Sequence, residues 1–596
     1  MKFNIKWALA GLAAALVGLA AAPWTLSQSA QVAALERQVK ARSGLRFVSH
    51  GRSVFAVLPR PHLAIYDLAF DREDGAASLK AGRLRVDLSL MSLLTGRVEM
   101  ARAAFHDVEL TLDPARMPTL AAVEGETAEG AAPGDVRIVN GRILLKRGDR
   151  TEVLADHVAL HLEWERADAP LSLVGQGVLR ALGEDHGPSR FALWAAQPGH
   201  LLHGSFSPIT LRADDESFRL TLNGSASMEP RLHFEGQFAS WAPSLRAAGG
   251  WFGLNLPLPG PYRDATLKGD AAFDPNLLSF PSLSLTVDGN ALDGAASVRF
   301  DGPRPSVSAT LAGSSVNLGS LLEEWPAASA GGQWSHESFP AAHLSAADLD
   351  LRFSASHVAI GDLNFDDAAL SVLLKNGRLD LSLAEASAYS GDLRARAVVS
   401  ESGGGLDIRG SVNAEKIDSA SLLWDGFKSQ SLSGAANLAA TFETSGENFY
   451  ELASRLDARG EFSVAAGEIY GIDLGLAFRR MEKRPLTAGV NLRSGRTGFE
   501  TLAAKFSVVL GVAEIEEGVA RNPRLSVFFS GRANVADRTL DLHATARGEP
   551  AGERAPAQLG FAISGGWDDP SIAPDAEGLI RRSDAAAPLL PKPAPE

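Results

Sequence analysis

The stretch Ser445-Gly-Glu-Asn-Phe449 opens a segment, residues 445–548, in which the hydrophobic period changes twice. With its first residue as the N-cap, apolar residues follow at helical spacing, which predicts a short helix. Phe462 and Val464 then alternate with polar neighbours, which predicts a strand, because successive strand side chains point to opposite faces. Ile472–Met481 is apolar on one side and predicts a second short helix. The segment therefore predicts a helix, a strand, a helix and then a run of strands.

Glycines bound a predicted turn at Gly467-Glu-Ile-Tyr-Gly471, and Asp473 is expected to cap the helix that follows. Beyond this helix, short apolar runs predict further strands. These strands are Val490–Leu492, Thr497–Phe499, Ala504–Leu510, Leu525–Phe529 and Leu540–Ala546. Strands with so little sequence between them favour an antiparallel meander.

Alternation of apolar and polar residues recurs over most of the chain, with its clearest further examples in the runs 84–90, 158–164, 283–287 and 379–383. The runs have no fixed spacing, which argues against a propeller or a β-helix. Asn140-Gly141 predicts a tight hairpin turn in the middle of one such apolar region. The 58 glycines and 31 prolines suit many short strands joined by turns. The pattern therefore predicts a mainly β, antiparallel fold.

Composition narrows the possible functions. The chain has 596 residues, so several domains or one long repeating body are expected. Its formal net charge of −14 argues against nucleic acid as a partner, because binding phosphates requires a basic surface. The absence of cysteine excludes disulfides, thiolate metal sites and cysteine nucleophiles.

The N-terminus predicts a membrane anchor. Trp7–Ala22 carries no charge, while Lys2 and Lys6 precede it, so the positive-inside rule places Met1 in the cytoplasm. The alternative is a cleaved signal peptide, because Ala20-Ala-Ala22 resembles a signal-peptidase cleavage site. Pro23 would then follow the cleavage site, a position that signal peptidase disfavours. We therefore expect an uncleaved transmembrane helix over residues 7–25.

Motifs near both ends of the chain resemble the AsmA family. Those in the C-terminal part are Leu456-Asp-Ala-Arg-Gly460, Gly467–Leu474, Thr497-Gly-Phe499, Gly518-Val519, Asn522-Pro523, Asp541-Leu542 and Gly566-Trp-Asp-Asp-Pro570. Those in the N-terminal part are Ser43-Gly44, Leu58-Pro59 and the strand Leu84–Leu90 followed by Leu93-Leu94-Thr-Gly96. The middle of the chain, roughly residues 190–345, matches the family only in its pattern of strands.

The resemblance implies a location, a fold and a partner. AsmA-family proteins are bacterial, are anchored in the inner membrane and act in the periplasm in outer-membrane assembly. In the longer members a groove-shaped β-sheet shields lipid tails between the two membranes. The implied fold is therefore an N-terminal transmembrane helix followed by an elongated, curled antiparallel β-sheet, with a few short helices. Membrane phospholipid is the implied partner, and other envelope proteins are further candidates.

The predicted organisation has eight parts. They are a cytoplasmic tip (1–6), the transmembrane helix (7–25), an AsmA-like N-terminal β region (26–115), a loop (116–134), a middle β region (135–324), a linker (325–344), an AsmA-like C-terminal β region (345–570) and a tail predicted to be disordered (571–596).

The apolar face of so many strands needs a cover, because soluble proteins do not expose patches of that size. A second sheet, curling of the sheet on itself, or a bound apolar ligand would each supply one, and the pattern alone does not separate them. The groove implied by the family favours a lipid-lined face. Its candidate lining residues are Leu84, Val86, Leu88, Leu285, Leu381, Phe462, Val464, Leu525, Val527, Phe529 and Leu542.

A search for catalytic and ligand-binding motifs finds none. The sequence has no nucleophile elbow, no Walker loop and no Gly-rich dinucleotide loop. His157 and His161 are spaced as in a zinc helix, but on a strand they would lie about 13 Å apart, too far to share a metal. We therefore expect no catalytic residues, no metal and no cofactor. Two functions remain: a carrier that shields phospholipid acyl chains, and an anchored scaffold or regulator of outer-membrane protein insertion that carries no lipid.

Overall fold

The computed structural model describes residues 46–575 and 580, except 50, 57–59, 72–76, 89–99, 114–133, 148–149, 167, 182–183, 203, 229–231, 252–261, 320–324, 331, 340–343, 345–346, 484–493, 549–557 and 568. Outside the described residues lie the expected transmembrane helix, Ser43-Gly44, Leu58-Pro59, Leu93–Gly96, Val490–Leu492, nearly all of the predicted loop 116–134 and most of the tail. None of the described helices is long and apolar enough to cross a bilayer.

The chain divides into two compact units. The first comprises Met1–Leu254, Arg263–Leu285 and Ser297–Asp301, and the second comprises Asn255–Tyr262, Thr286–Ala296 and Gly302–Glu596. The division falls within two strands, β14 (Leu277–Val287) and β15 (Asn290–Arg299).

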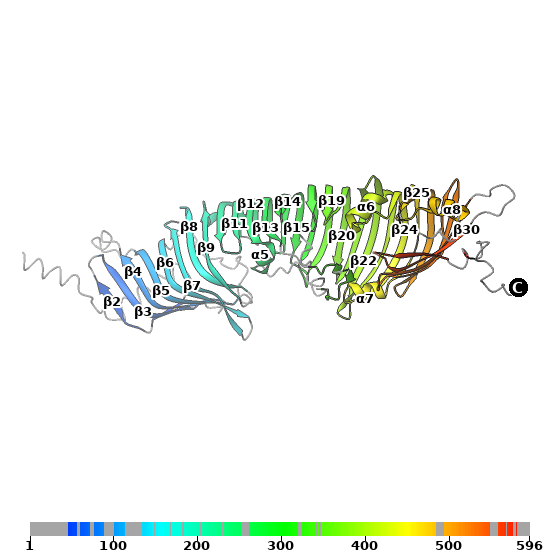
Figure 1. Cartoon of the computed structure of the whole chain (residues 1–596). Helices are drawn as coiled ribbons and strands as arrows, with labels where there is room; N and C mark the ends of the chain where they lie inside the picture. Colours follow the sequence, from blue (N-terminus) through cyan, green and yellow to red (C-terminus); the bar gives the residue numbers. More distant parts are fainter. Residues whose placement is uncertain are drawn as a thin grey trace, which may run out of the picture. The chain divides into compact units, whose positions relative to one another are not determined.

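The first unit is built on one sheet whose strands follow chain order (Figure 1). From β3 to β13 each strand pairs with the next, and β1 and β2 both pair with β3. No pairing between described strands closes this sheet. The strands are β1 (Arg46–Ser49), β2 (Ser53–Ala56), β3 (His62–Asp71), β4 (Ala77–Leu88), β5 (Met100–Leu112), β6 (Gly134–Arg147), β7 (Arg150–Trp164), β8 (Leu171–Ala181), β9 (Glu184–Ala195), β10 (Ser207–Asp214), β11 (Arg219–Ser227), β12 (His233–Ser244) and β13 (Arg263–Asp274), with helices α4 (Pro198–Leu202) and α5 (Leu245–Trp251).

The second unit is also built on one sheet, in which β16 pairs with β19 and each strand from β19 to β31 pairs with the next. Two-residue turns with positive φ, such as Asn376-Gly377 and Leu510-Gly511, join several neighbours, as tight antiparallel hairpins require. The strands are β16 (Ser306–Asn317), β19 (Asp348–Ile360), β20 (Leu363–Lys375), β21 (Arg378–Ala388), β22 (Gly391–Ser402), β23 (Gly405–Asp418), β24 (Leu432–Gly446), β25 (Asp457–Tyr470), β26 (Arg496–Val509), β27 (Val512–Asn522), β28 (Leu525–Asn534), β29 (Thr539–Gly548), β30 (Gln558–Gly566) and β31 (Ser571–Pro574).

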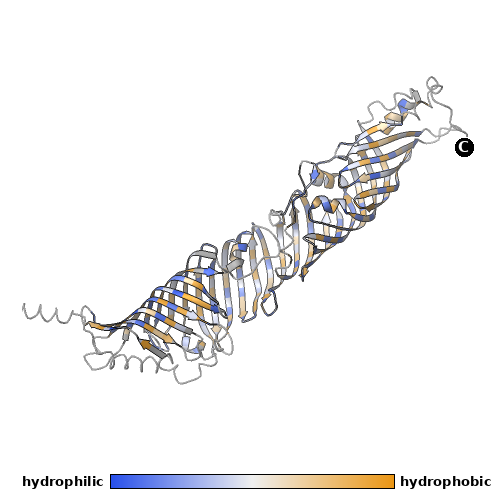
Figure 2. Cartoon of the chain, turned by 90° about the horizontal axis from the view of Figure 1, so that it is seen from below, coloured by the Kyte–Doolittle hydropathy of each residue, from blue (hydrophilic) through white to orange (hydrophobic). Residues whose placement is uncertain are grey.

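Short elements lie between these strands. Helices α6 (Ser419–Phe427), α7 (Phe449–Ser454) and α8 (Leu474–Lys483) belong to the second unit, as does the small hairpin of β17 (Ser329–Ala330) and β18 (Gln333–Trp334). A mainly β fold with antiparallel pairing, open sheets and few short helices is thus confirmed. Along the strands, hydrophobic and hydrophilic residues alternate (Figure 2).

Two pairings depart from the antiparallel expectation: β5 with β6 and β16 with β19 are parallel. Two parallel strands cannot be joined by a tight turn, because the chain must travel back to the end of the sheet at which the first strand began. Residues 113–133 and 318–347, the long connections at these two places, provide the length for that return. The sequence pattern predicts a loop and a linker there but does not show that the strands on either side of each connection are parallel.

Local boundaries are corrected at three places. Asn140-Gly141 is not a hairpin turn, because β6 runs through it as one strand. The turn predicted at Gly467–Gly471 is confined to its end, since β25 continues to Tyr470. Helix α7 is capped by Asn448 rather than Ser445, and the Asn448 side chain accepts a hydrogen bond from the Glu451 amide. Asn and Gly favour positive φ in bulges as well as in turns, so the Asn140-Gly141 motif is compatible with either structure.

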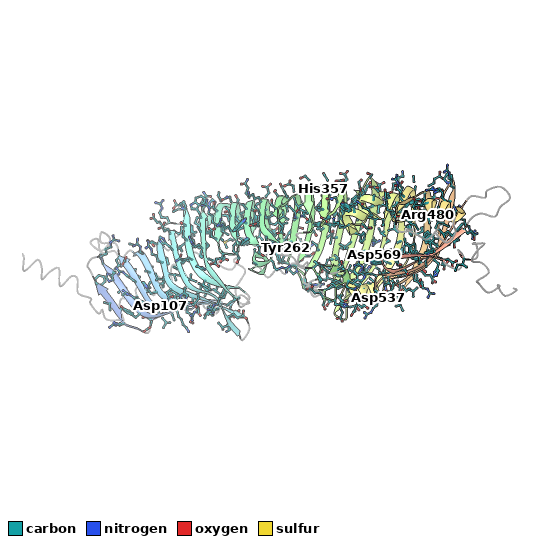
Figure 3. All side chains as sticks on the ribbon, in the orientation of Figure 1. Asp107, Tyr262, His357, Arg480, Asp537 and Asp569 are labelled. Atoms are coloured by element: carbon teal, nitrogen blue, oxygen red, sulfur yellow. The ribbon has the colours of Figure 1, made fainter. Side chains whose placement is uncertain are left out.

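Asn140 instead belongs to a kink that crosses neighbouring strands. Asp67 of β3, Asp107 of β5 and Asn140 of β6 have φ of 53°, 51° and 58° and lie at the same level of the sheet. The Asn140 Nδ2 group donates a hydrogen bond of 2.7 Å to Asp107 Oδ1, and Asp107 is labelled in Figure 3. Backbone irregularities of this kind bend strands, so their alignment bends this part of the sheet.

Candidate functional site

A continuous apolar row crosses the sheet of the first unit. Cross-strand register places one large apolar residue from each of β7 to β12 side by side on one face. We call these residues the first apolar row: Leu162, Leu173, Leu193, Leu211, Leu222 and Phe238. Six strands at a spacing of about 4.8 Å make the row about 24 Å long. This length exceeds half of the hydrocarbon core of a bilayer, about 15 Å.

Burial changes along the face that carries this row. Through Ala103 and Val136 the register continues to Val86 of β4, which is only 1% exposed. Val86 belongs to a buried cluster that also contains Ile65, Leu68 and Leu84. The six residues of the first apolar row, in contrast, are half-buried and keep part of their surface exposed. The row is therefore able to contact a ligand.

A second apolar row crosses the second unit. It begins with Leu311 of β16 and Phe353 of β19, which are paired in register. It continues strand by strand through Leu370, Leu383, Val412, Phe506 and Ile515 to Leu542 and Ile563. Glycine or alanine stands at the intervening strands. Most of the row is half-buried.

Segments from outside the sheet cover two parts of this unit. At one part Phe339 and Leu344 pack with Leu374, Leu406 and other strand residues, and the ring of Phe339 meets that of Phe449 on α7 edge-on. The rim segment, which we define as residues 325–339, is held there by hydrogen bonds. The Phe339 amide donates to the Glu447 carbonyl at 2.9 Å, and the Trp334 indole donates to the Val535 carbonyl at 2.8 Å.

Helix α8 provides the other cover. Its Leu474 and Ala477, with Ile472 just before it, are buried against β29 and β30, where they contact Ala546 and Leu559. The Asp473 carboxylate caps the helix by accepting a hydrogen bond of 2.7 Å from the Leu476 amide, which confirms the expected cap. Arg480 lies on the same helix and is labelled in Figure 3.

The structure distributes the predicted lining residues over several environments. Leu84, Val86 and Leu88 share one cluster. Leu381 packs beside the cluster under the rim segment. Phe462, Val464, Val527 and Phe529 meet in a cluster with Phe499 and Leu502, and Leu525, Val527 and Phe529 also contact the cluster under α8. Leu542 lies in the second apolar row, and Leu285 is half-buried on β14. The structure therefore groups nine of them into local clusters and leaves two apart.

The rows also depend on a feature that sequence reasoning missed. At five places in the described part of the chain a phenylalanine is paired directly across from a glycine, and its ring lies where a Cβ atom on that glycine would stand. The pairs are Phe191 with Gly175, Phe442 with Gly410, Phe506 with Gly460, Phe499 with Gly467, and Phe529 with Gly518. Only the register reveals the pairs, because partners can lie more than thirty residues apart. Because these rings lie against the backbone of the neighbouring strand, they project less from the apolar face of the sheet.

The opposite face, which we call the polar face, carries charged side chains. There Asp135 accepts hydrogen bonds from Arg102 at 2.6 Å and Arg137 at 3.3 Å and lies 3.0 Å from His161 Nε2. Burial alone would raise the pKa of the Asp135 carboxyl, but the hydrogen bond and charge of Arg102 outweigh it and lower that pKa. Phe528, on the polar phase of β28, is covered by the Arg547 guanidinium, 4.9 Å from its ring centre. Within the described part of the chain, no group of three His, Asp or Glu side chains could hold a metal ion.

Comparison with known proteins adds a family match. The model of the AsmA family matches residues 323–523, which span β19 to β27 and helices α6 to α8. No curated protein matches the chain in a sequence comparison. The match includes five of the motifs on which the resemblance was based, from Leu456 to Pro523, and therefore confirms it. Residues 323–523 of this chain are therefore similar to the AsmA family.

Proposed function

We propose that this chain is an inner-membrane-anchored periplasmic protein of bacterial outer-membrane assembly, and that its apolar rows shield phospholipid acyl chains. Similarity of its C-terminal part to the AsmA family supports the place in the cell envelope. The uncharged segment Trp7–Ala22, preceded by lysines, supports the anchor and its orientation.

The observation that carries the lipid proposal is the first apolar row. Its six large side chains are in register across six strands, face the same way and remain half-buried. A core that had to be filled by its own side chains would be packed to crystal-like density, with such residues fully buried. A row that is continuous and still accessible fits an extended apolar ligand.

The proposed mechanism is passive. Each methylene that leaves water for an apolar surface is stabilised by about 0.8 kcal/mol, so a chain of many methylenes gains enough to remain on the rows. The polar headgroup would stay in water at the edge of the sheet. No bond is made or broken in this scheme, and no catalytic residue or cofactor is required.

Site-specific photo-crosslinking in intact cells tests the proposal. A crosslinking residue at Leu193 or Leu211 in the first unit, and at Leu542 in the second, should capture phospholipid that mass spectrometry can identify. Asp541 is the matched control, because it precedes Leu542 on β29 and points to the polar face. It should capture none.

The scaffold alternative predicts a different result. If the chain carries no lipid, Leu193, Leu211 and Leu542 should crosslink only to protein. Lipid at Leu84 alone would not support the carrier, since an anchored protein can meet lipid near its membrane end. Capture at Leu542 is therefore required.

A further inference from the structure

A hollow on the polar face of the first unit points to a second binding site. Its volume is about 390 Å³, and its lining comes from five consecutive strands, β6 to β10. Most of its lining residues have the strand phase opposite to that of the first apolar row, and the others, such as Leu160 and Phe191, stand between them on the same strands.

Small and apolar residues form the floor of this hollow. Val174 and Ala192 are directly paired at its centre, and Ala159 lies beside them. Val174 is 51% exposed, so its side chain is accessible to a ligand. The exposed floor would gain stability from contact with an apolar group.

Basic residues surround the floor. Register places Arg137 and His161 on one side of Val174 and Arg212 on the other, with Arg190 diagonally next to Arg212. Arg137 is 3.3 Å from Asp135, which partly neutralises it. Arg190 and Arg212 make no ion pair or hydrogen bond with any residue that the structure describes. The carboxylate in the lining, Asp214, stands directly across from Arg190 in the strand register and lies 3.7 Å from Arg219.

The local charge is therefore positive in a chain whose formal net charge is −14. Guanidinium groups bind phosphate strongly, because their planar donors match its oxygens. An apolar floor beside two unpaired guanidinium groups fits a ligand that has both chemical parts. We propose that this hollow, which we call the arginine hollow, binds a phosphate ester that carries a short apolar group. A phospholipid or a small phosphate monoester could supply this chemistry.

Equilibrium dialysis of the full chain in a non-ionic detergent tests the assignment, with hexyl phosphate as the probe. Arg190→Gln and Arg212→Gln should each weaken its binding about five- to tenfold, because each removes a charge-assisted contact at a partly exposed site. Lys268→Gln is the matched control. Lys268 lies in the same cross-strand row as Arg212 but outside the hollow, so its substitution should change binding less than about twofold.

Further probes separate the two parts of the ligand. Inorganic phosphate should bind much more weakly than hexyl phosphate, and Val174→Asp should abolish the difference. Competition by dihexanoyl phosphatidylglycerol would identify a lipid as the source, and its absence would identify a small ester. Equal binding by the arginine variants and the wild type, or equal affinity for phosphate and hexyl phosphate, would overturn the proposal. Lipid capture on the apolar rows would be unaffected by these substitutions, so the two proposals fail independently.

Discussion

The first apolar row and the α8 end of the second unit have the same alternation of residues but different surroundings. Leu193 and Leu211 are half-buried in the first row, whereas Leu559 beneath α8 is 1% exposed. The difference does not come from the strands, because each of these residues stands on the apolar face of its strand. It comes from segments that reach the sheet from elsewhere in the chain: α8 in one place and the rim segment in another.

Two roles for one pattern follow from this contrast. Where α8 or the rim segment covers the sheet, apolar residues form a packed core that stabilises the unit. Where the row is only half-buried, the same residue types are available to a ligand. A carrier needs both, since a sheet with one face fully exposed would not be stable in water.

The largest expected effect is that of a charge in the covered region. Val527 is half-buried and packs against two buried clusters, so Val527→Asp would place an unpaired carboxylate against apolar side chains and should cost more than about 3 kcal/mol of unfolding free energy. Ser526→Asp, on the polar face, should cost less than about 1 kcal/mol. Urea unfolding of the detergent-solubilised chain, followed by circular dichroism, measures both. Similar losses for the two variants would contradict the assignment of faces.

Truncation of leucines should separate covered from half-exposed regions more finely. Leu374 is 1% exposed under the rim segment, and Leu374→Ala should reduce the unfolding free energy by about 2–5 kcal/mol. Leu211→Ala removes a half-buried side chain and should cost about 1 kcal/mol. The same unfolding experiment compares them, and lipid capture at a crosslinker on Leu193 should fall only for Leu211→Ala. If Leu211→Ala were the more destabilising change, the first row would be a packed core.

The smallest expected effect comes from weakening helix α8, which covers part of the apolar face. Asp473→Ala removes the cap of α8 and should destabilise it by about 1 kcal/mol. A crosslinker at Phe529, which packs against the cluster under α8, should then capture more lipid than in the wild type. Asn448→Ala is the control, because it removes the cap of α7 by the same chemistry at a distant place. An equal increase from both variants would show a general loosening rather than an effect of α8.

The sequence alone accounts for some of the contacts among the candidate lining residues. Leu525, Val527 and Phe529 share a face and pack against the same buried cluster, and their shared face follows from the alternation of a strand. Alternation in the run 158–164 places Leu162 on the apolar face of its strand but does not show that it belongs to the first apolar row. Its members come from six strands, and only hydrogen-bond register shows that they are neighbours. The arginine hollow escaped notice for the same reason.

The order of residues alone therefore specified the strands, the face to which each side chain points and the cap at Asp473, because these depend on neighbours within a few positions. Tertiary structure decided the parallel pairings, the contacts of Phe529 with Gly518 and Phe191 with Gly175, and the segments that cover the apolar face. These features join residues that are distant in sequence. Asn140-Gly141 shows the limit most clearly: positive φ is a local preference, but whether it produces a turn or a kink depends on the strands on either side.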